Sequence, residues 1–261
     1  MVAAGALVWA LSGVSCTDGI VQRESGAEVG ERAVAGEVIL FDGRSLDGWD
    51  GDPRYWRVEE GAITGETTAE APLERNTFLI ARTAIEGDFV LSFEYRVTSE
   101  WANSGVQYRS VEWPAPSDSD RWIVGGYQAD IDEPVTYTGI LYGERDRGIL
   151  AQRGERVRIG RGGSPTGIGS LGERDDLARA VRGRGEWNSY RIEATGNRII
   201  HTINGVQMIE AVDEDDPATS HDQPGARQNG VVALQLHTGR PMRIQFRNLR
   251  VEALSASDAR H

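Results

Sequence analysis

The sequence predicts an all-β protein, a two-sheet sandwich or jelly roll with one short helix. Short apolar runs recur along the chain, and many alternate polar with apolar residues at the period of two that is typical of a strand. Turn signals such as Asn204-Gly205 separate them. The 261 residues include 32 glycines and are 39% hydrophobic, so the chain can turn often and still bury a sizeable core. Only residues 175–182 favour a helix, because acids begin this segment and arginines end it.

The two ends of the chain differ from its middle. Residues 1–16 form a small, apolar segment that predicts an export signal, and its end at Cys16 resembles a bacterial lipoprotein processing box. Lipidation of Cys16 and soluble secretion both stay open. Residues 17–36 are polar and acidic and predict a flexible tether, and residues 255–261 predict a loose tail. We therefore expect one β domain at 37–254, in an exported protein that is periplasmic or a membrane-anchored lipoprotein.

Composition excludes several classes of partner and site. The net charge of −12 argues against nucleic acid, because a phosphate backbone requires clustered Lys and Arg, and the arginines here are interspersed with acids. No run of about 18 apolar residues follows the N-terminal segment, so membrane contact is expected only through a lipid on Cys16. Cys16 is the single cysteine, which excludes an internal disulfide and a cysteine-based metal cluster.

The predicted strands follow one another along the domain. Residues 89–97 show the clearest alternation, with one apolar face and one face of serine, glutamate and arginine. Residues 136–181 interrupt the series, because they are dense in charge and glycine, and the predicted helix lies near their end. The strands are expected at 38–41, 55–65 (a hairpin), 77–81, 89–97, 103–109, 126–131, 187–194, 198–203, 206–211, 231–237 and 242–251.

Two of these strands, 103–109 and 126–131, have an apolar face and an unusual polar face. Alternation places Gln107 and Arg109 on the polar face of the first, and Gln128 and Asp130 on that of the second. Planar groups with several hydrogen-bonding atoms suit sugar hydroxyls. The pattern therefore predicts a carbohydrate-binding sheet face, and an ordinary solvated face is the alternative.

The loop between these strands carries Trp113 and Trp122. Exposed tryptophans beside a polar sheet suit stacking on the apolar face of a sugar ring. The alternative is that both rings cap the core. Tyr142 and Glu144 are expected on a loop after a polar strand, from which they could reach over the groove.

Several motifs, taken together, point to a family. Residues 40–49 read Leu-Phe-Asp-Gly-Arg-Ser-Leu-Asp-Gly-Trp, and further motifs lie at 103–106, 126–131, 139–142, 185–192, 201–205, 233–237 and 245–249. In order and spacing, over residues 37–253, they resemble the 3-keto-disaccharide hydrolase family. The resemblance implies a concanavalin-A-like jelly roll of two curved antiparallel sheets with the groove on the concave face. It also implies bacterial export and action on glycosides oxidised at carbon 3.

Such a substrate has a characteristic chemistry. The ketone acidifies the hydrogen on carbon 2, so a base can form an enolate that expels the group on carbon 1, and water can then add to give net hydrolysis. This route needs a base, an acid and a donor for the enolate oxygen. We expect Asp130 and His237 as base and acid in either order, Glu144 as a second acid or base, and Arg109 as the enolate donor. Sugar hydroxyls are assigned to Asn103, Gln107, Gln128, Tyr142 and Gln235.

Other interpretations of these residues stay open. A non-catalytic lectin-like module would use the same amides and aromatics, whereas a retaining endoglucanase ranks last because no suitable run of carboxylates appears. His201 shares an alternation face with isoleucines and is expected to be structural. No cofactor is firmly predicted, although Asp130, Glu144 and His237 are chemically suited to a divalent metal ion.

Overall fold

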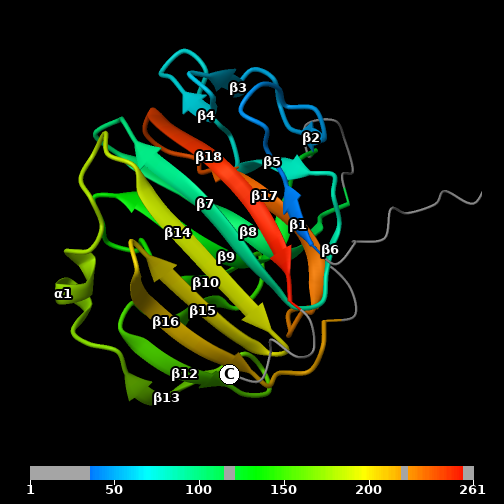
Figure 1. The fold of residues 1–261 in the computed structure, drawn as a ribbon, viewed down its shortest axis with the longest axis vertical. Coiled ribbons are helices and arrows are strands. Elements are labelled where there is room, and N and C mark those ends of the chain that lie inside the picture. The colour runs from blue at the N-terminus through cyan, green and yellow to red at the C-terminus, as the bar shows by residue number, and fades with distance from the viewer. Residues whose placement is uncertain (1–35, 115–120, 219–222, 255–261) are drawn as a thin grey trace, which may run out of the picture. The chain divides into compact units, whose positions relative to one another are not determined.

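The computed structural model describes residues 36–114, 121–218 and 223–254, and Figure 1 shows them as two β-sheets in layers. Contacts within the chain define the compact unit Ala33–His261, which contains all of these residues. The predicted export signal, Cys16, the tether to residue 35 and the tail at 255–261 lie outside the described residues. In the described part of the chain, no helix is both long and apolar enough to cross a membrane.

The first sheet has ten strands. Its order is β13-β12-β16-β15-β14-β7-β18-β4-β3, and β1 also pairs with β18. Its pairs are antiparallel except β12 with β16, which is parallel and departs from the expected antiparallel pattern. The strands are β1 (Glu37–Ile39), β3 (Trp56–Glu59), β4 (Ala62–Thr67), β7 (Phe89–Val97), β12 (Glu155–Ile159), β13 (Pro165–Ser170), β14 (Asn188–Thr195), β15 (Arg198–Ile203), β16 (Val206–Asp213) and β18 (Met242–Ala253).

The second sheet has eight strands and carries the candidate site. Its order is β11-β10-β9-β8-β17-β5-β2, with β6 paired to β17. The strands are β2 (Trp49–Asp50), β5 (Thr77–Ala81), β6 (Ile85–Glu86), β8 (Ala102–Glu112), β9 (Val124–Glu133), β10 (Leu141–Glu144), β11 (Gly148–Ala151) and β17 (Asn229–Leu236). In Figure 1, β7, β14 and β18 of the first sheet lie in front of β8, β9 and β17.

One hydrophobic core joins the facing sides of the two sheets. Phe93 stacks on Tyr190 with ring centroids 5.1 Å apart, and Tyr108 stacks on Tyr127 at 5.8 Å. Burying each such ring contributes about 1.5 to 3 kcal/mol. The apolar faces of the alternating strands therefore hold the two sheets together. The predicted all-β jelly roll is confirmed.

His201 lies fully buried in this core. Its Nε2 contacts the Tyr108 hydroxyl at 2.7 Å and its Nδ1 contacts the Tyr190 hydroxyl at 3.1 Å. Burial lowers the pKa of His201 to about 3, so the ring stays neutral. The expected structural role is confirmed.

Residues 136–181 contain more regular structure than their composition indicates. Strands β10, β11, β12 and β13 all form there, and the helix α1 (Arg174–Ala178) is shorter than the expected 175–182. Tyr142 and Glu144 therefore lie on a strand and not on a loop. Pairing with β9 explains this, since a partner strand supplies the hydrogen bonds that a short segment rich in glycine cannot provide alone.

Candidate functional site

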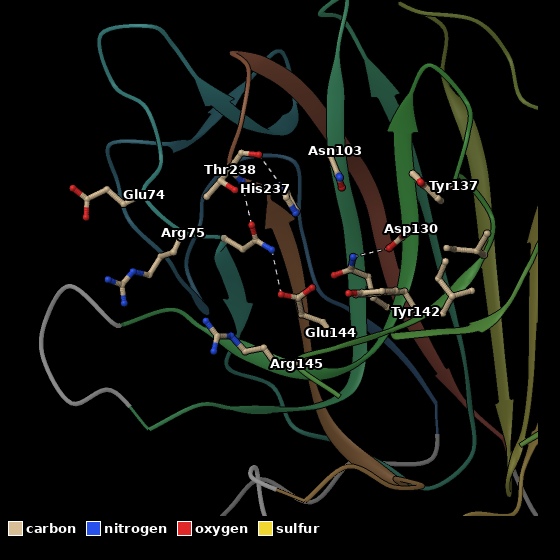
Figure 2. A pocket seen from close by; sticks show the side chains of 14 residues that line it. Glu74, Arg75, Asn103, Asp130, Tyr137, Tyr142, Glu144, Arg145, His237 and Thr238 are labelled. Atoms are coloured by element: carbon tan, nitrogen blue, oxygen red, sulfur yellow. Dashed lines mark hydrogen bonds between the residues drawn. The ribbon is translucent and has the colours of Figure 1, made fainter. Parts of the chain in front are cut away.

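A pocket of about 610 Å³ lies on the face of the eight-stranded sheet that is turned away from the core. Strands β8, β9 and β10 supply part of its wall, and the chain just beyond β17 supplies another part, as Figure 2 shows. The lining residues are Glu74, Arg75, Asn76, Asn103, Gln128, Asp130, Tyr137, Ile140, Tyr142, Glu144, Arg145, Ile149, His237 and Thr238.

Strand register explains why these side chains meet. Gln128 pairs with Gln107 on one side and with Tyr142 on the other, so their side chains share a face. Gly105 pairs with Asp130. A Cβ atom on Gly105 would lie 2.7 Å from Gln128 Cγ, so the missing side chain lets Gln128 lie across strand β8.

Three buried glutamines form a hydrogen-bonded network beneath the pocket. Gln107 Nε2 donates to Gln128 Oε1 at 2.6 Å, and Gln128 Nε2 donates to Gln235 Oε1 at 3.3 Å. Gln128 Nε2 also donates to Asp130 Oδ1 at 2.6 Å, and Gln235 Nε2 donates to Glu144 Oε2 at 3.3 Å. The network thus fixes both carboxyl groups relative to each other.

Asp130 has the most perturbed carboxyl of the pocket. Burial raises its pKa to about 8, and the charges of Asp132 and Glu144 add to this, while the hydrogen bond from Gln128 opposes it. At neutral pH this carboxyl is therefore mostly protonated. Because Oδ1 accepts the Gln128 N–H, the proton belongs on Oδ2.

Glu144 lies between two amide donors. Burial raises its pKa, and the Asn76 hydrogen bond and the nearby His237 act in the opposite direction. Asn76 Nδ2 donates to Glu144 Oε1 at 3.2 Å, while Asn76 Oδ1 accepts the Thr238 N–H at 3.1 Å (Figure 2). Asn76 thereby ties Glu144 to the residue after His237.

His237 continues the pairing of β17 with β8, because its N–H donates to the Asn103 carbonyl at 3.2 Å. Its ring Nδ1 lies 2.7 Å from the Thr238 carbonyl oxygen. A carbonyl oxygen only accepts, so Nδ1 carries the hydrogen and the neutral ring has its lone pair on Nε2.

The predicted placement of Arg109 is wrong. Its side chain is buried in the sandwich, where the guanidinium donates to the carbonyls of Gly196 at 2.7 Å and Gly87 at 2.9 Å. A bulge between Tyr108 and Val111 breaks the alternation, and Arg109 has φ of 47°. The side chain therefore turns inward instead of joining the polar face.

The two tryptophans also lie outside the lining of this pocket. Trp113 packs under the Arg145 guanidinium, 5.5 Å from its ring centroid. Trp122 lines a separate pocket and donates its Nε1 hydrogen to Asp50 Oδ1 at 2.6 Å. Of the predicted sugar ligands, Asn103, Gln128 and Tyr142 line the first pocket, and Gln107 and Gln235 support its floor.

Sequence reasoning missed several residues that line the pocket. Tyr137, Ile140 and Ile149 form an apolar part of the wall, which suits the apolar face of a sugar ring better than the predicted tryptophans. Asn76 was detectable, since it is a polar residue directly before the buried strand β5. Tyr137 and Ile149 gave no such signal, because the surrounding composition resembles a loop.

Asp130, Glu144 and His237 do not form a metal centre as the structure places them. Among the described residues, no group of three or more His, Cys, Asp or Glu side chains is arranged to hold a metal ion. The two carboxyl groups are instead bound by amide N–H donors.

A jelly roll with amides, carboxyl groups and tyrosines around one pocket is a carbohydrate-active protein in fold and site. Residues 36–252 match the 3-keto-alpha-glucoside-1,2-lyase-like domain, and the chain belongs to this family. The resemblance inferred from the motifs is thereby confirmed. No curated protein matches the chain significantly.

Solved structures agree with this fold. A crystal structure from Parabacteroides distasonis, described as a candidate glycosyl hydrolase, matches with a TM-score of 0.52 and 19% identity, over 84% of this chain and 99% of that chain. A second structure from the same organism, with the same description, matches with a TM-score of 0.50 and 17% identity, over 84% and 94%. At such identities the likeness shows the fold alone.

Proposed function

We propose that this protein cleaves 3-keto-glycosides by base-initiated elimination across carbons 2 and 1, with or without later addition of water. The observation that carries the proposal is the pocket itself, where a histidine, an aspartate whose pKa is raised to about 8 and the buried carboxyl of Glu144 line one cavity. Membership of the family supports the same chemistry.

His237 is the base of the proposed reaction. Its Nδ1 hydrogen is held by the Thr238 carbonyl, so the lone pair on Nε2 can accept the proton from carbon 2. The electrons of the broken C2–H bond form the enolate.

Asp130 takes over the task that the sequence assigned to Arg109. A neutral carboxyl can donate a hydrogen bond, and a raised pKa keeps Asp130 neutral at pH 7. Tyr142 lines the same pocket, and burial raises the pKa of its hydroxyl, so it also stays a donor. We assign both groups to the ketone oxygen, whose negative charge they stabilise in the enolate.

Glu144 completes the reaction as the acid. As the enolate collapses, a double bond forms between carbons 1 and 2, the C1–O bond breaks, and the leaving oxygen needs a proton. The raised pKa of Glu144 favours its donation of that proton. Addition of water across the new double bond, OH to carbon 1 and H to carbon 2, would give net hydrolysis.

A non-catalytic carbohydrate-binding function is the second candidate, and the amide-rich floor of Gln107, Gln128 and Gln235 favours it. Incubation of the purified protein with a 3-keto-glucoside and with its unoxidised parent, each with and without chelator, separates the two. We expect only the ketone to be consumed. Binding of both without product would favour the binding module, and cleavage of the parent alone would overturn the proposed chemistry.

We also propose that the protein is exported and that Cys16 anchors it through a lipid. The apolar segment that ends at Cys16 supports this proposal. Expression of the full chain and of Cys16→Ser with a lipid label tests it. Label in the first and not in the second is expected, whereas label in neither would contradict the anchor.

A further inference from the structure

A second pocket adjoins the first. It encloses about 260 Å³ and shares the segment Glu74, Arg75 and Asn76 with the pocket that holds Asp130. In Figure 2, Glu74 and Arg75 lie on the opposite side of the first pocket from Asp130 and Tyr137. A ligand that fills the first pocket and is longer than one sugar can therefore extend past Asn76 into the second.

Trp122 gives the second pocket a fixed aromatic wall. Its backbone has φ of 57°, which is unusual for a bulky residue. Three contacts hold it there. Nε1 donates to Asp50 Oδ1 at 2.6 Å, the carbonyl accepts the Phe78 N–H at 3.0 Å, and the side chain packs against the small buried cluster that contains Phe78. The ring is thus positioned before any ligand arrives.

The lining of the second pocket is positively charged, although the net charge of the whole chain is −12. Three arginines, Arg54, Arg75 and Arg121, face two acids, Asp52 and Glu74. Arg54 is paired with Asp52, with Nε 3.0 Å from Oδ1 and Nη2 2.5 Å from Oδ2.

Arg121 is the arginine best suited to a ligand. It lies over the Trp122 ring at 4.8 Å and reaches a carboxylate oxygen of Asp50 only at 4.0 Å. That carboxylate is already bound by Arg82 and by Trp122. The weak pairing leaves Arg121 able to bind a carboxylate.

We propose that the second pocket holds the leaving group of the substrate and selects a ring that carries a carboxylate. Trp122 would contact the ring beside Arg121, and Arg121 would bind the acid. The inference rests on the proposed function, because it takes the first pocket as the site of the ketosugar. Glu144 accepts a hydrogen bond from Asn76, which belongs to the segment that both pockets share. With the leaving group in the second pocket, Glu144 lies next to the leaving oxygen. An acidic sugar and an aromatic acid both have the required chemistry.

Calorimetric titration of the full chain tests the proposal with two matched pairs. Glucuronate is compared with glucose, and 4-hydroxybenzoate with 4-hydroxybenzyl alcohol. At least one acid should bind about tenfold more tightly than its neutral partner, and the pair that shows this identifies the source of the ring.

Arg121→Gln should remove most of that preference. Arg191→Gln, an exposed arginine of the other sheet, should keep it. Equal binding within both pairs, or an unchanged preference in Arg121→Gln, would overturn the inference.

Turnover of methyl 3-keto-glucoside separates this inference from the proposed function, because a methyl group is too short to reach the second pocket. Cleavage without any preference for carboxylates overturns the second-pocket inference alone. Preference for carboxylates without cleavage overturns the proposed reaction and leaves an acid-binding site.

Discussion

Burial keeps the Asp130 carboxyl neutral, and the hydrogen bond from Gln128 decides which of its oxygens carries the proton. The Gln128 N–H occupies one carboxyl oxygen, and burial raises the pKa to about 8. The folded protein holds this proton up to about pH 8, whereas the unfolded chain releases it near the usual value of 3.8. The unfolded state therefore binds fewer protons between these values, and stability falls as the pH rises through them.

Asp130→Asn tests both consequences. Asparagine keeps an oxygen for the Gln128 N–H and does not titrate, so at pH 8 we expect the variant to be about 1 to 2 kcal/mol more stable than the wild type. The gain should vanish near pH 4. Turnover should drop, and the decline of wild-type activity above about pH 8 should be absent. Thermal melts and pH–rate profiles measure these effects, and a stability gain that does not depend on pH would contradict the assignment.

Arg109 illustrates a polar residue whose function is structural. Its guanidinium donates to backbone carbonyls at the end of the sandwich and lies 5.5 Å from the centroid of the Phe89 ring. Arg109→Met should fill the same space but leave these carbonyls without a donor. We expect a loss of about 2 to 4 kcal/mol in unfolding free energy, with little change in KM at low temperature.

The matched control for Arg109 is Arg145→Met. Arg145 lines the pocket, so its loss should change KM and leave the melting temperature nearly unaltered. A raised KM in Arg109→Met, without a lower melting temperature, would restore the role that strict alternation assigns to Arg109.

At the scale of elements, strand alternation predicted the site where the strands are regular. It placed Gln107, Gln128 and Gln235 correctly on one polar face, and the register of β8, β9 and β17 then brings them together. It failed at the bulge of β8, where the inward turn of Arg109 is stabilised by carbonyls 22 to 87 residues away in the chain. It also failed at β10, since that strand depends on pairing with β9. Both features are set by long-range contacts that local pattern cannot report.

Gln107→Leu tests whether the strands β8 and β9 cooperate through the glutamine network. Gln107 does not line the pocket, yet it donates to Gln128 and so orients the Gln128 N–H toward Asp130. Without the Gln107 donor, the Gln128 amide can rotate. Asp130 then loses the hydrogen bond from Gln128, which lowers the pKa of its carboxyl. We expect the alkaline limit of activity to move above about pH 8, and unfolding free energy to fall by about 1 to 3 kcal/mol. A purely structural Gln107 would lower stability without moving the pH profile.

At the scale of the whole molecule, the segment with Tyr142 and Glu144 must be held against the sandwich. Arg147 does this from just beyond β10. Its guanidinium contacts Asp213 Oδ2 at 2.8 Å and Asp215 Oδ2 at 3.3 Å, and it donates to the Gly225 carbonyl at 3.0 Å. These acceptors lie at the end of β16 and beyond, more than 60 residues later in the chain. The buried charges fix where β10 lies.

Arg147→Met should therefore disturb the site through the fold. The Asp213 side chain is 1% exposed, and loss of its partner leaves a buried charge uncompensated, which typically costs about 3 to 5 kcal/mol. Below the melting temperature we expect faster amide hydrogen exchange at residues 141–151 and lower kcat/KM, because Glu144 is no longer held in place. Arg158→Met removes an exposed pair with Glu214 at 3.5 Å and should cost about 1 kcal/mol or less. If both variants lose the same stability, or if exchange at 141–151 is unchanged in Arg147→Met, then β10 is positioned by its pairing with β9 alone.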